Sequence, residues 1–349
     1  MTSSNTILAA NVSDLLLAHA EQADRSINWP AESWNALGQA GMLGRSIPAE
    51  FGGTAVEPVA FQLGMEEISS SCLTTAFILS QREAAVRQLL KGPAHLQQRY
   101  LPSLVDGSAY VTVGLSQLTT SRQHLGPVLR ATPTSNGGYC LDGEIPWVTG
   151  ADHAIGIVAG ATLPDGQQLL VVIPADRLRG MIETPLPLAA LVGSRTSLIR
   201  CRQVELEADC VLMNPTDNVL GKLGGGGLDT SCLAIGLTGA VVRYLQHEAE
   251  RRPDLLPIAE RFESAWRSAQ GRLHQLAQSV ADSGQTLELR LDCTKLALRS
   301  AQAGLMIAKG VGFVSPHPVQ RWVRQAMFFL VWSCPRPVAE GVLADLADF

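Results

Sequence analysis

Cysteine and histidine, the residue types that most often ligate metals or act as nucleophiles, are scattered along this chain. None of the seven cysteines belongs to a C-x-x-C pair, and no histidine stands beside one at metal-ligand spacing. This pattern predicts reduced, buried thiols and no metal site. The cysteines are Cys72, Cys140, Cys201, Cys210, Cys232, Cys293 and Cys334.

A few other polar residues stand out. His153 and His317 are isolated, and isolated histidines are more often structural or exposed than catalytic. Gln81 and Arg82 interrupt an otherwise apolar segment. Two interpretations of this pair remain open: it lines a pocket, or it makes a buried or interfacial hydrogen bond.

The composition is that of a folded globular protein. The chain has 349 residues, of which 46% are hydrophobic and 17% are charged, so burial can offset the entropy of ordering it. A net charge of −5 argues against nucleic acid as a partner. No apolar run approaches the roughly 18–20 residues that span a bilayer. The first residues lack the pattern of a secretory signal, and we expect a cytoplasmic protein.

The hydrophobic period divides the chain into three regions. Residues 1–110 have helical spacing and predict an N-terminal α-helical domain. Residues 111–222 alternate with a period of two, and Asn136-Gly137-Gly138 and Pro164-Asp165-Gly166 each indicate a hairpin turn. We expect a small antiparallel barrel or sandwich there.

Residues 223–349 return to helical spacing. Four long apolar stripes predict a C-terminal four-helix bundle, the fourth covering residues 319–332. Gly236 and Gly239 lie in the first stripe, where they would let a neighbouring helix approach closely. The resulting fold class is α+β, with helices, then a β domain, then a bundle. That order does not establish a function by itself.

Several segments give this chain a resemblance to the acyl-CoA dehydrogenase superfamily, over nearly its whole length. The segments are residues 34–43 (WNALGQAGML), 47–53 (IPAEFGG), 100–107 (YLPSLVDG), 138–143 (GYCLDG), 147–151 (WVTGA) and 310–313 (GVGF), with Arg324 beyond the last. Their combination is specific, whereas each alone would be weak evidence.

The resemblance implies a site for FAD. Trp147 would shield one face of the isoalloxazine ring, and Thr149, after Val148, would hydrogen-bond near its N5 edge. Ser116 occupies the position of a threonine that contacts the pyrimidine edge in this family. The family's substrate-side pattern is replaced just beyond it, by Gln117 and Leu118.

The resemblance also implies more distant cofactor contacts. Arg251 matches an arginine that reaches the cofactor of a neighbouring subunit in the family, although the Phe-Gly that normally follows is absent. A solvated arginine is an equal alternative. Gly310 and Gly312 match a glycine turn that approaches the dinucleotide, with a plain turn as the alternative.

One expected residue is missing. Oxidation of a thioester at Cα–Cβ needs a general base that takes the α-proton. The family places a glutamate at one of two positions, which are Ser333 and Ser231 in this chain. Asp229 and Glu340 are displaced candidates, although Asp229 suits a helix cap and Glu340 an exposed turn of helix.

Three functions are therefore open. The first is an FAD-dependent acyl-CoA dehydrogenase-like oxidoreductase with a non-standard or missing base. The second is a flavin-dependent monooxygenase on the same fold, which needs no thioester base. The third is a non-catalytic homologue that keeps the shape for binding a ligand or a partner. The resemblance implies an acyl-CoA or related substrate, an electron-transfer partner, and a homodimer or homotetramer.

Overall fold

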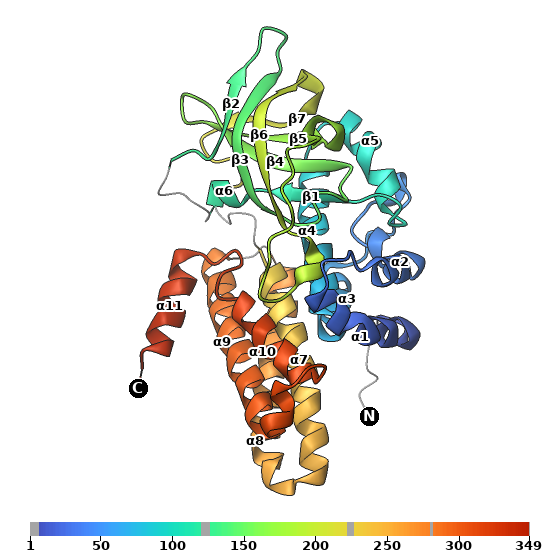
Figure 1. Ribbon diagram of the computed structural model, residues 1–349, viewed down its shortest axis with the longest axis vertical. Coiled ribbons are helices and arrows are strands. Elements are labelled where there is room, and N and C mark those ends of the chain that lie inside the picture. The colour runs from blue at the N-terminus through green and yellow to red at the C-terminus, as the bar shows by residue number, and fades with distance from the viewer. Residues whose placement is uncertain (1–6, 120–125, 222–226, 280–281, 349) are drawn as a thin grey trace.

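The computed structural model describes residues 7–119, 126–221, 227–279 and 282–348. Figure 1 shows a sheet at one end, a helical bundle at the other, and N-terminal helices along one side of their junction. This order of helices, sheet and bundle confirms the expected fold class. Within the described residues, no helix is both long and apolar enough to cross a membrane.

Five helices come first. They are α1 (Ala10–Arg25), α2 (Ala31–Gln39), α3 (Pro58–Ser71), α4 (Leu73–Leu89) and α5 (Ala94–Leu104), with 3-10 turns η1 (Met42–Gly44) and η2 (Ala49–Phe51) between α2 and α3. Gly41 adopts a positive φ of 69° and ends α2, because a residue without Cβ enters this conformation at no steric cost. Helix α4 is buried along most of its length and packs against both the sheet and α7.

The central region is one seven-stranded sheet. Its strands are β1 (Val111–Gly114), β2 (Leu129–Pro133), β3 (Tyr139–Val148), β4 (Gly156–Thr162), β5 (Gln168–Pro174), β6 (Ser197–Leu206) and β7 (Val211–Thr216). The strand order is β6-β3-β2-β4-β5-β7, and β1 pairs with β4. The short helix α6 (Ser116–Thr119) follows β1, and the 3-10 turn η5 (Val192–Ser194) precedes β6.

The expectation of an antiparallel barrel or sandwich was wrong for two of the strand pairings. Both hairpin turns are present, and they join β2 to β3 and β4 to β5 in antiparallel pairs. However, β1 and β2 each run parallel to β4. Parallel neighbours require crossover connections, and no short turn motif in the sequence marks such a pairing.

The C-terminal region is a bundle. It comprises α7 (Asp229–Arg251), α8 (Leu256–Gln278), α9 (Ser283–Ala308) and α10 (Pro318–Phe328), with η8 (Lys309–Phe313) before α10 and α11 (Arg336–Leu346) after it. The fourth helix ends at Phe328, earlier than its apolar stripe indicated, and a turn leads into α11.

Small residues set the helix spacing in the bundle. A Cβ at Gly236 would lie 2.6 Å from the carbonyl oxygen of Glu66 on α3, and one at Gly239 would lie 3.0 Å from the ring of Trp266 on α8. The close approach expected at both glycines is confirmed. Ser69 of α3 uses this proximity to donate a hydrogen bond of 2.7 Å to the carbonyl of Leu233 on α7.

Candidate active site

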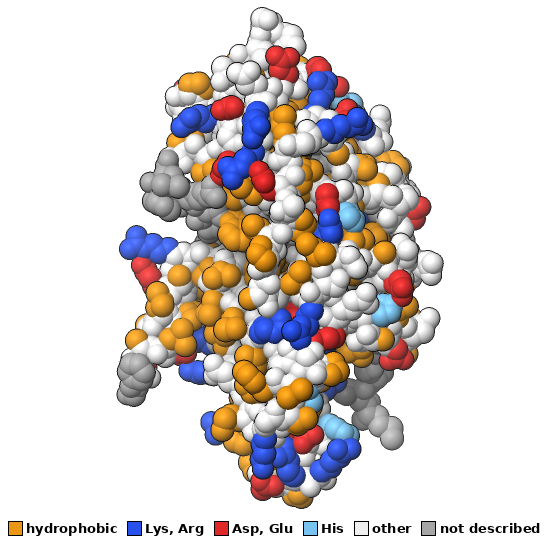
Figure 2. All heavy atoms as spheres, in the orientation of Figure 1, with side chains coloured by type: hydrophobic (Ala, Val, Ile, Leu, Met, Phe, Trp, Pro, Cys, Tyr) orange, Lys and Arg blue, Asp and Glu red, His pale blue; other side chains and the backbone are white. Residues whose placement is uncertain are grey.

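A cavity of about 710 Å³ lies where the sheet, α4 and the bundle meet. Its wall is formed by one face of α4, the ends of β1 and β3, the loop before η5, the start of α7, and the segment from α10 to α11. In Figure 2, hydrophobic side chains gather between the sheet and the bundle. The size suits one buried organic ligand.

Trp147 forms one side of this cavity. The pairing of β3 with β6 shifts register between Ile145 and Val148, so the strand bulges at this point. Trp147 has a positive φ of 61° and is 52% exposed, although large aromatic side chains are usually well buried. A bulge of this kind redirects a side chain. The indole consequently faces the cavity, while Val148 packs in the core.

The hydroxyl group at the wall beside Trp147 belongs to Thr196, which sequence reasoning missed. Thr149 is fully buried and does not line the cavity, and its Oγ1 is 3.1 Å from Oγ1 of Thr196. Thr196 Oγ1 lies a further 3.0 Å from Oγ of Ser194. The contact of the Thr149 hydroxyl with a flavin stays a prediction, and Thr196 is the threonine whose side chain lines the cavity. The hydroxyl-rich run around residue 196 was the available signal.

Ser116 and Arg324 also reach the cavity. Ser116 Oγ donates a 3.1 Å hydrogen bond to the carbonyl of Pro146 and so braces the bulge beneath Trp147. Arg324 Nη1 lies 2.6 Å from Oδ2 of Asp24, which is fully buried, and donates to the carbonyl of Ala189 at 2.8 Å. This ion pair ties α10 to α1 and to the loop before η5.

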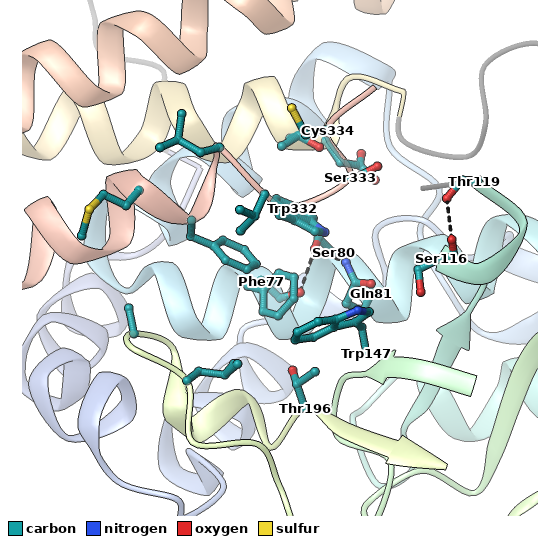
Figure 3. Close-up of a pocket in the computed structure, with 18 of the residues that line it drawn as sticks. Phe77, Ser80, Gln81, Ser116, Thr119, Trp147, Thr196, Trp332, Ser333 and Cys334 are labelled. Carbon is teal, nitrogen blue, oxygen red and sulfur yellow. Dashed lines mark hydrogen bonds between the residues drawn. The ribbon is translucent and has the colours of Figure 1, made fainter. Parts of the chain in front are cut away.

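Aromatic side chains line the bundle side of the cavity. Phe328 and Trp332 stack with ring centroids 5.4 Å apart and planes 13° apart. Phe77 of α4 meets both rings edge-on, at 4.9 and 5.0 Å. Figure 3 shows Trp147 facing the cavity from the side opposite Ser333, with Trp332 and Gln81 between. The cavity is thus walled largely by apolar and aromatic groups with a few hydroxyls.

The polar pair on α4 serves two purposes. Gln81 lines the cavity, and its Nε2 donates to Oγ of Ser80 at 3.1 Å. Arg82 points the other way, is fully buried, pairs with Glu83 and donates to the carbonyl of Leu104 at 2.7 Å. Each of the two open interpretations therefore holds for one member of the pair.

The two serines at the expected base positions differ in access. Ser333 lines the cavity from the turn between α10 and α11, with a positive φ of 44°. Ser231 is fully buried in α7 and is not part of the cavity wall. An unassisted hydroxyl is a poor base near neutral pH, and neither serine is hydrogen-bonded to a histidine of the described chain.

Asp229 is the single carboxylate among the described residues that line the cavity. It lies in the first turn of α7, where it makes no capping hydrogen bond, so the expected cap is absent. Its Oδ2 instead pairs with Nη2 of Arg87 on α4. Burial opposes the charge on Arg87, but Asp229 outweighs burial and raises the pKa of the guanidinium. Glu340 is exposed and bonded to Arg336, away from the cavity.

The remaining predicted cofactor contacts lie far from this cavity. Arg251 is exposed at the end of α7, about 33 Å along the helix from Asp229 at 1.5 Å per residue. Gly310 and Gly312 belong to η8, beside the exposed side chains of Val311 and Phe313. One chain does not bring these three residues to Trp147, so their cofactor contact remains a prediction that needs a second subunit.

One group of residues bears on the expectation that the chain has no metal site. Among the described residues, Glu207, Asp209 and Cys210 have potential ligand atoms within 4.8 Å of one another, with both carboxylates exposed. Exposed acidic groups commonly gather without a metal. All seven cysteines are free thiols.

Comparison with known proteins finds relatives in one superfamily. Residues 8–108 match the family model for the acyl-CoA dehydrogenase N-terminal domain. The probable acyl-CoA dehydrogenase YngJ of Bacillus subtilis (strain 168) is 24% identical over 339 residues, covering 88% of this chain and 87% of that protein. This chain is similar in sequence to the acyl-CoA dehydrogenase superfamily.

Solved structures share the fold over almost the whole chain. Butyryl-CoA dehydrogenase from Megasphaera elsdenii superposes with a TM-score of 0.83 at 16% identity, covering 97% of this chain and 98% of that one. Dibenzothiophene monooxygenase (TdsC) from Paenibacillus sp. A11-2 superposes with a TM-score of 0.80 at 15% identity, covering 95% and 93%. One architecture therefore serves proteins named for two different chemistries.

Proposed function

We propose that this protein is a flavin-dependent oxidoreductase that oxidises the Cα–Cβ bond of an acyl thioester. The observation that carries the proposal is the half-exposed Trp147 in the wall of a cavity of about 710 Å³. A tryptophan held outward by a bulge offers a flat apolar surface, which is what a bound isoalloxazine requires on one face.

The residues around Trp147 fit a flavin. Trp147 would stack on the ring, while the hydroxyls of Thr196 and Ser116 would meet its polar edge. A bound flavin supplies the two-electron acceptor for the oxidation. The aromatic group of Phe77, Phe328 and Trp332 would hold the acyl chain and exclude water.

Asp229 is the proton acceptor in this proposal. Its Oδ2 faces Arg87, and no partner within the described chain occupies its Oδ1, which leaves that oxygen for the α-proton. Protonation would remove the charge that Arg87 pairs with, so the ion pair opposes the transfer. A slower reaction than one with a free carboxylate follows from this geometry.

The visible spectrum of the purified protein tests the proposal. We expect flavin absorbance that bleaches on anaerobic addition of one member of a panel of acyl-CoAs. Trp147→Ala should weaken flavin binding, whereas Trp147→Phe, which keeps an aromatic face, should retain most of it. Protein that binds no flavin after incubation with excess FAD would contradict the proposal.

A flavin-dependent monooxygenase is the second candidate. The observation that favours it is the pairing of the cavity's carboxylate with Arg87, together with serines at positions 231 and 333, because oxygen insertion needs no thioester base. It predicts bound flavin that no acyl-CoA bleaches. It also predicts oxygen consumption that begins only when reduced flavin is supplied.

A further inference from the structure

Arg290 is a buried cation without a counter-ion in the described part of the chain. It lies on α9, is only 4% exposed, and makes no ion pair with a carboxylate of the described chain. Its Nε and Nη1 are enclosed and have no hydrogen-bond partner among the described residues. Burial lowers the pKa of the guanidinium to about 10, which still leaves it charged near neutral pH. An unpaired buried charge is costly, and proteins rarely keep one without a use.

Arg290 stands directly behind the Ser333 end of the cavity. Its Nη2 donates two hydrogen bonds of 2.9 Å, to the carbonyls of Phe329 and Trp332. Its guanidinium also lies 5.8 Å from the ring centroid of Phe329. These contacts fix the turn that presents Ser333 and Cys334 to the cavity (Figure 3).

The other charges around the cavity cancel in pairs. Asp229 pairs with Arg87, and Arg324 pairs with Asp24. Arg290 is left over, so the described surroundings of the cavity carry one net positive charge at its Ser333 end. Two helix N-termini add partial positive charge there, because Thr230 at the start of α7 and Ala339 in the first turn of α11 both line the cavity.

Hydrogen-bond donors are present at the same end. Ser333 carries a hydroxyl, and the backbone N–H groups of Ser333 and Cys334 donate to no carbonyl of the described chain. Ser333 has the positive φ that follows a helical turn, a conformation in which successive N–H groups can converge on one anion. The turn therefore combines donors in front with a fixed cation behind.

The geometry points to a carboxylate-binding subsite at Ser333 and Cys334, with the charge of Arg290 behind it, so that the substrate is an acyl compound that carries its own carboxylate. The subsite specifies the substrate class of the proposed function, and it rests on that function for the position of the reacting carbons. A carboxylate held there would supply the counter-charge that Arg290 lacks.

Calorimetric titration of the full-length protein with three matched six-carbon probes tests the subsite. The probes are hexanoate, hexan-1-ol and hexylamine, which differ only in the head group. We expect hexanoate to bind at least about tenfold more tightly than hexan-1-ol, as a charge-assisted contact provides, and hexylamine to bind most weakly. Equal affinities of hexanoate and hexan-1-ol would overturn the proposal.

Three variants locate the preference. Arg290→Met should bring hexanoate affinity down to that of hexan-1-ol, whereas Arg290→Lys should retain part of the difference. Arg177→Met removes a remote surface charge and should leave the ratio unchanged. If Arg290→Met leaves the ratio of hexanoate affinity to hexan-1-ol affinity unchanged, the charge of Arg290 has no role in binding the carboxylate.

A fourth variant decides the matter if Arg290→Met does not fold. Ser333→Asp places a fixed carboxylate in the subsite, so it should abolish the hexanoate preference and favour hexylamine. Unchanged hexanoate binding in Ser333→Asp would refute the site. The subsite and the proposed function can fail independently. If the protein prefers hexanoate but binds no flavin, the subsite is supported and the proposed function is refuted. Conversely, if acyl-CoA bleaches the flavin but the protein shows no preference for hexanoate, the proposed function is supported and the subsite is refuted.

Discussion

Thr196 stands between Thr149 and the cavity, with the two hydroxyl oxygens 3.1 Å apart. The two threonines are 47 residues apart in sequence but become neighbours because Val148 on β3 pairs with Ser197 on β6. Thr196 also contacts Ser194, so its hydroxyl at the cavity wall is bonded to two buried hydroxyls. The hydroxyl of Thr196 can bind a ligand, and the buried hydroxyls of Thr149 and Ser194 support it.

Replacing each threonine by valine separates these roles. Thr196→Val removes a hydroxyl from the cavity wall, and we expect flavin affinity to fall about fivefold to tenfold, the worth of one hydrogen bond. Thr149→Val should leave flavin affinity nearly unchanged but cost about 1 kcal/mol of unfolding free energy. Flavin titration and urea denaturation measure the two effects. A larger loss of flavin affinity in Thr149→Val would reverse the assignment.

Asp229 provides a second test. If its carboxylate takes the α-proton, Asp229→Asn should slow anaerobic flavin reduction by acyl-CoA at least about a hundredfold while flavin remains bound. Stopped-flow absorbance gives the rate, and the flavin spectrum gives the occupancy. Arg87→Met is the matched control, because it removes the partner and keeps the carboxylate. Its rate should not fall and should rise, because the ion pair opposes the transfer, and a fall as large as that of Asp229→Asn would count against Asp229 as the base.

Much of the fold could be predicted from the sequence because its signals are local. The asparagine-glycine and aspartate-glycine turns gave two hairpins, and the apolar periods separated helices from strands. The parallel pairing of β1 with β4 joins segments about 45 residues apart and has no local signal. The helix that begins at Pro318 ends at Phe328, before its apolar spacing does. The apolar residues beyond it lie in a turn, where they line the cavity and do not form a helix face.

The site was less predictable for the same reason. Trp147 was identified, but the bulge that turns it outward depends on pairing with β6. Asp24 and Arg324, 300 residues apart in sequence, meet only in the folded chain. Nothing in the sequence distinguishes Arg290 from any other charged residue of a helix. Its significance is that no carboxylate of the described residues pairs with it, and sequence spacing does not show that.

Asp24 should be essential to stability. It is fully buried, and its Oδ1 accepts hydrogen bonds of 2.9 Å from the N–H of Leu191 and from Nε2 of Gln325, while Oδ2 pairs with Arg324. Asp24→Asn leaves the Arg324 cation without its partner, and we expect a loss of about 3–5 kcal/mol in the free energy of unfolding. Urea denaturation measures it. Glu340→Gln, which breaks an exposed pair, should leave the midpoint unchanged.

Asp152 should make stability depend on pH. Burial opposes its charge, but hydrogen bonds from His153 and Arg195 outweigh burial and hold the pKa of Asp152 well below its usual range. A depressed folded-state pKa stabilises the protein above the unfolded value of about 4, and this contribution is lost as pH falls below it. Asp152→Asn should therefore lower the thermal midpoint at pH 7 and converge with the native protein in acid. If the difference in thermal midpoint between Asp152→Asn and the native protein stays constant from pH 7 to pH 3, titration of Asp152 does not contribute to stability.

Ser333→Glu tests the cavity as a whole. It places a carboxylate at one of the two positions where the resemblance predicts the base, at the end of the cavity near Arg290, which has no counter-ion among the described residues. With acyl-CoAs that carry no carboxylate of their own, we expect the rate of anaerobic flavin reduction to rise at least about tenfold, since a second proton acceptor is then available. Ser231→Glu is the control, because Ser231 is fully buried and its side chain has no opening to the cavity. Ser231→Glu should destabilise the fold without raising the rate, as expected for a carboxylate forced into a closed core. If neither variant accelerates reduction while flavin stays bound, the slow step is not proton removal, and the monooxygenase becomes the better description of this cavity.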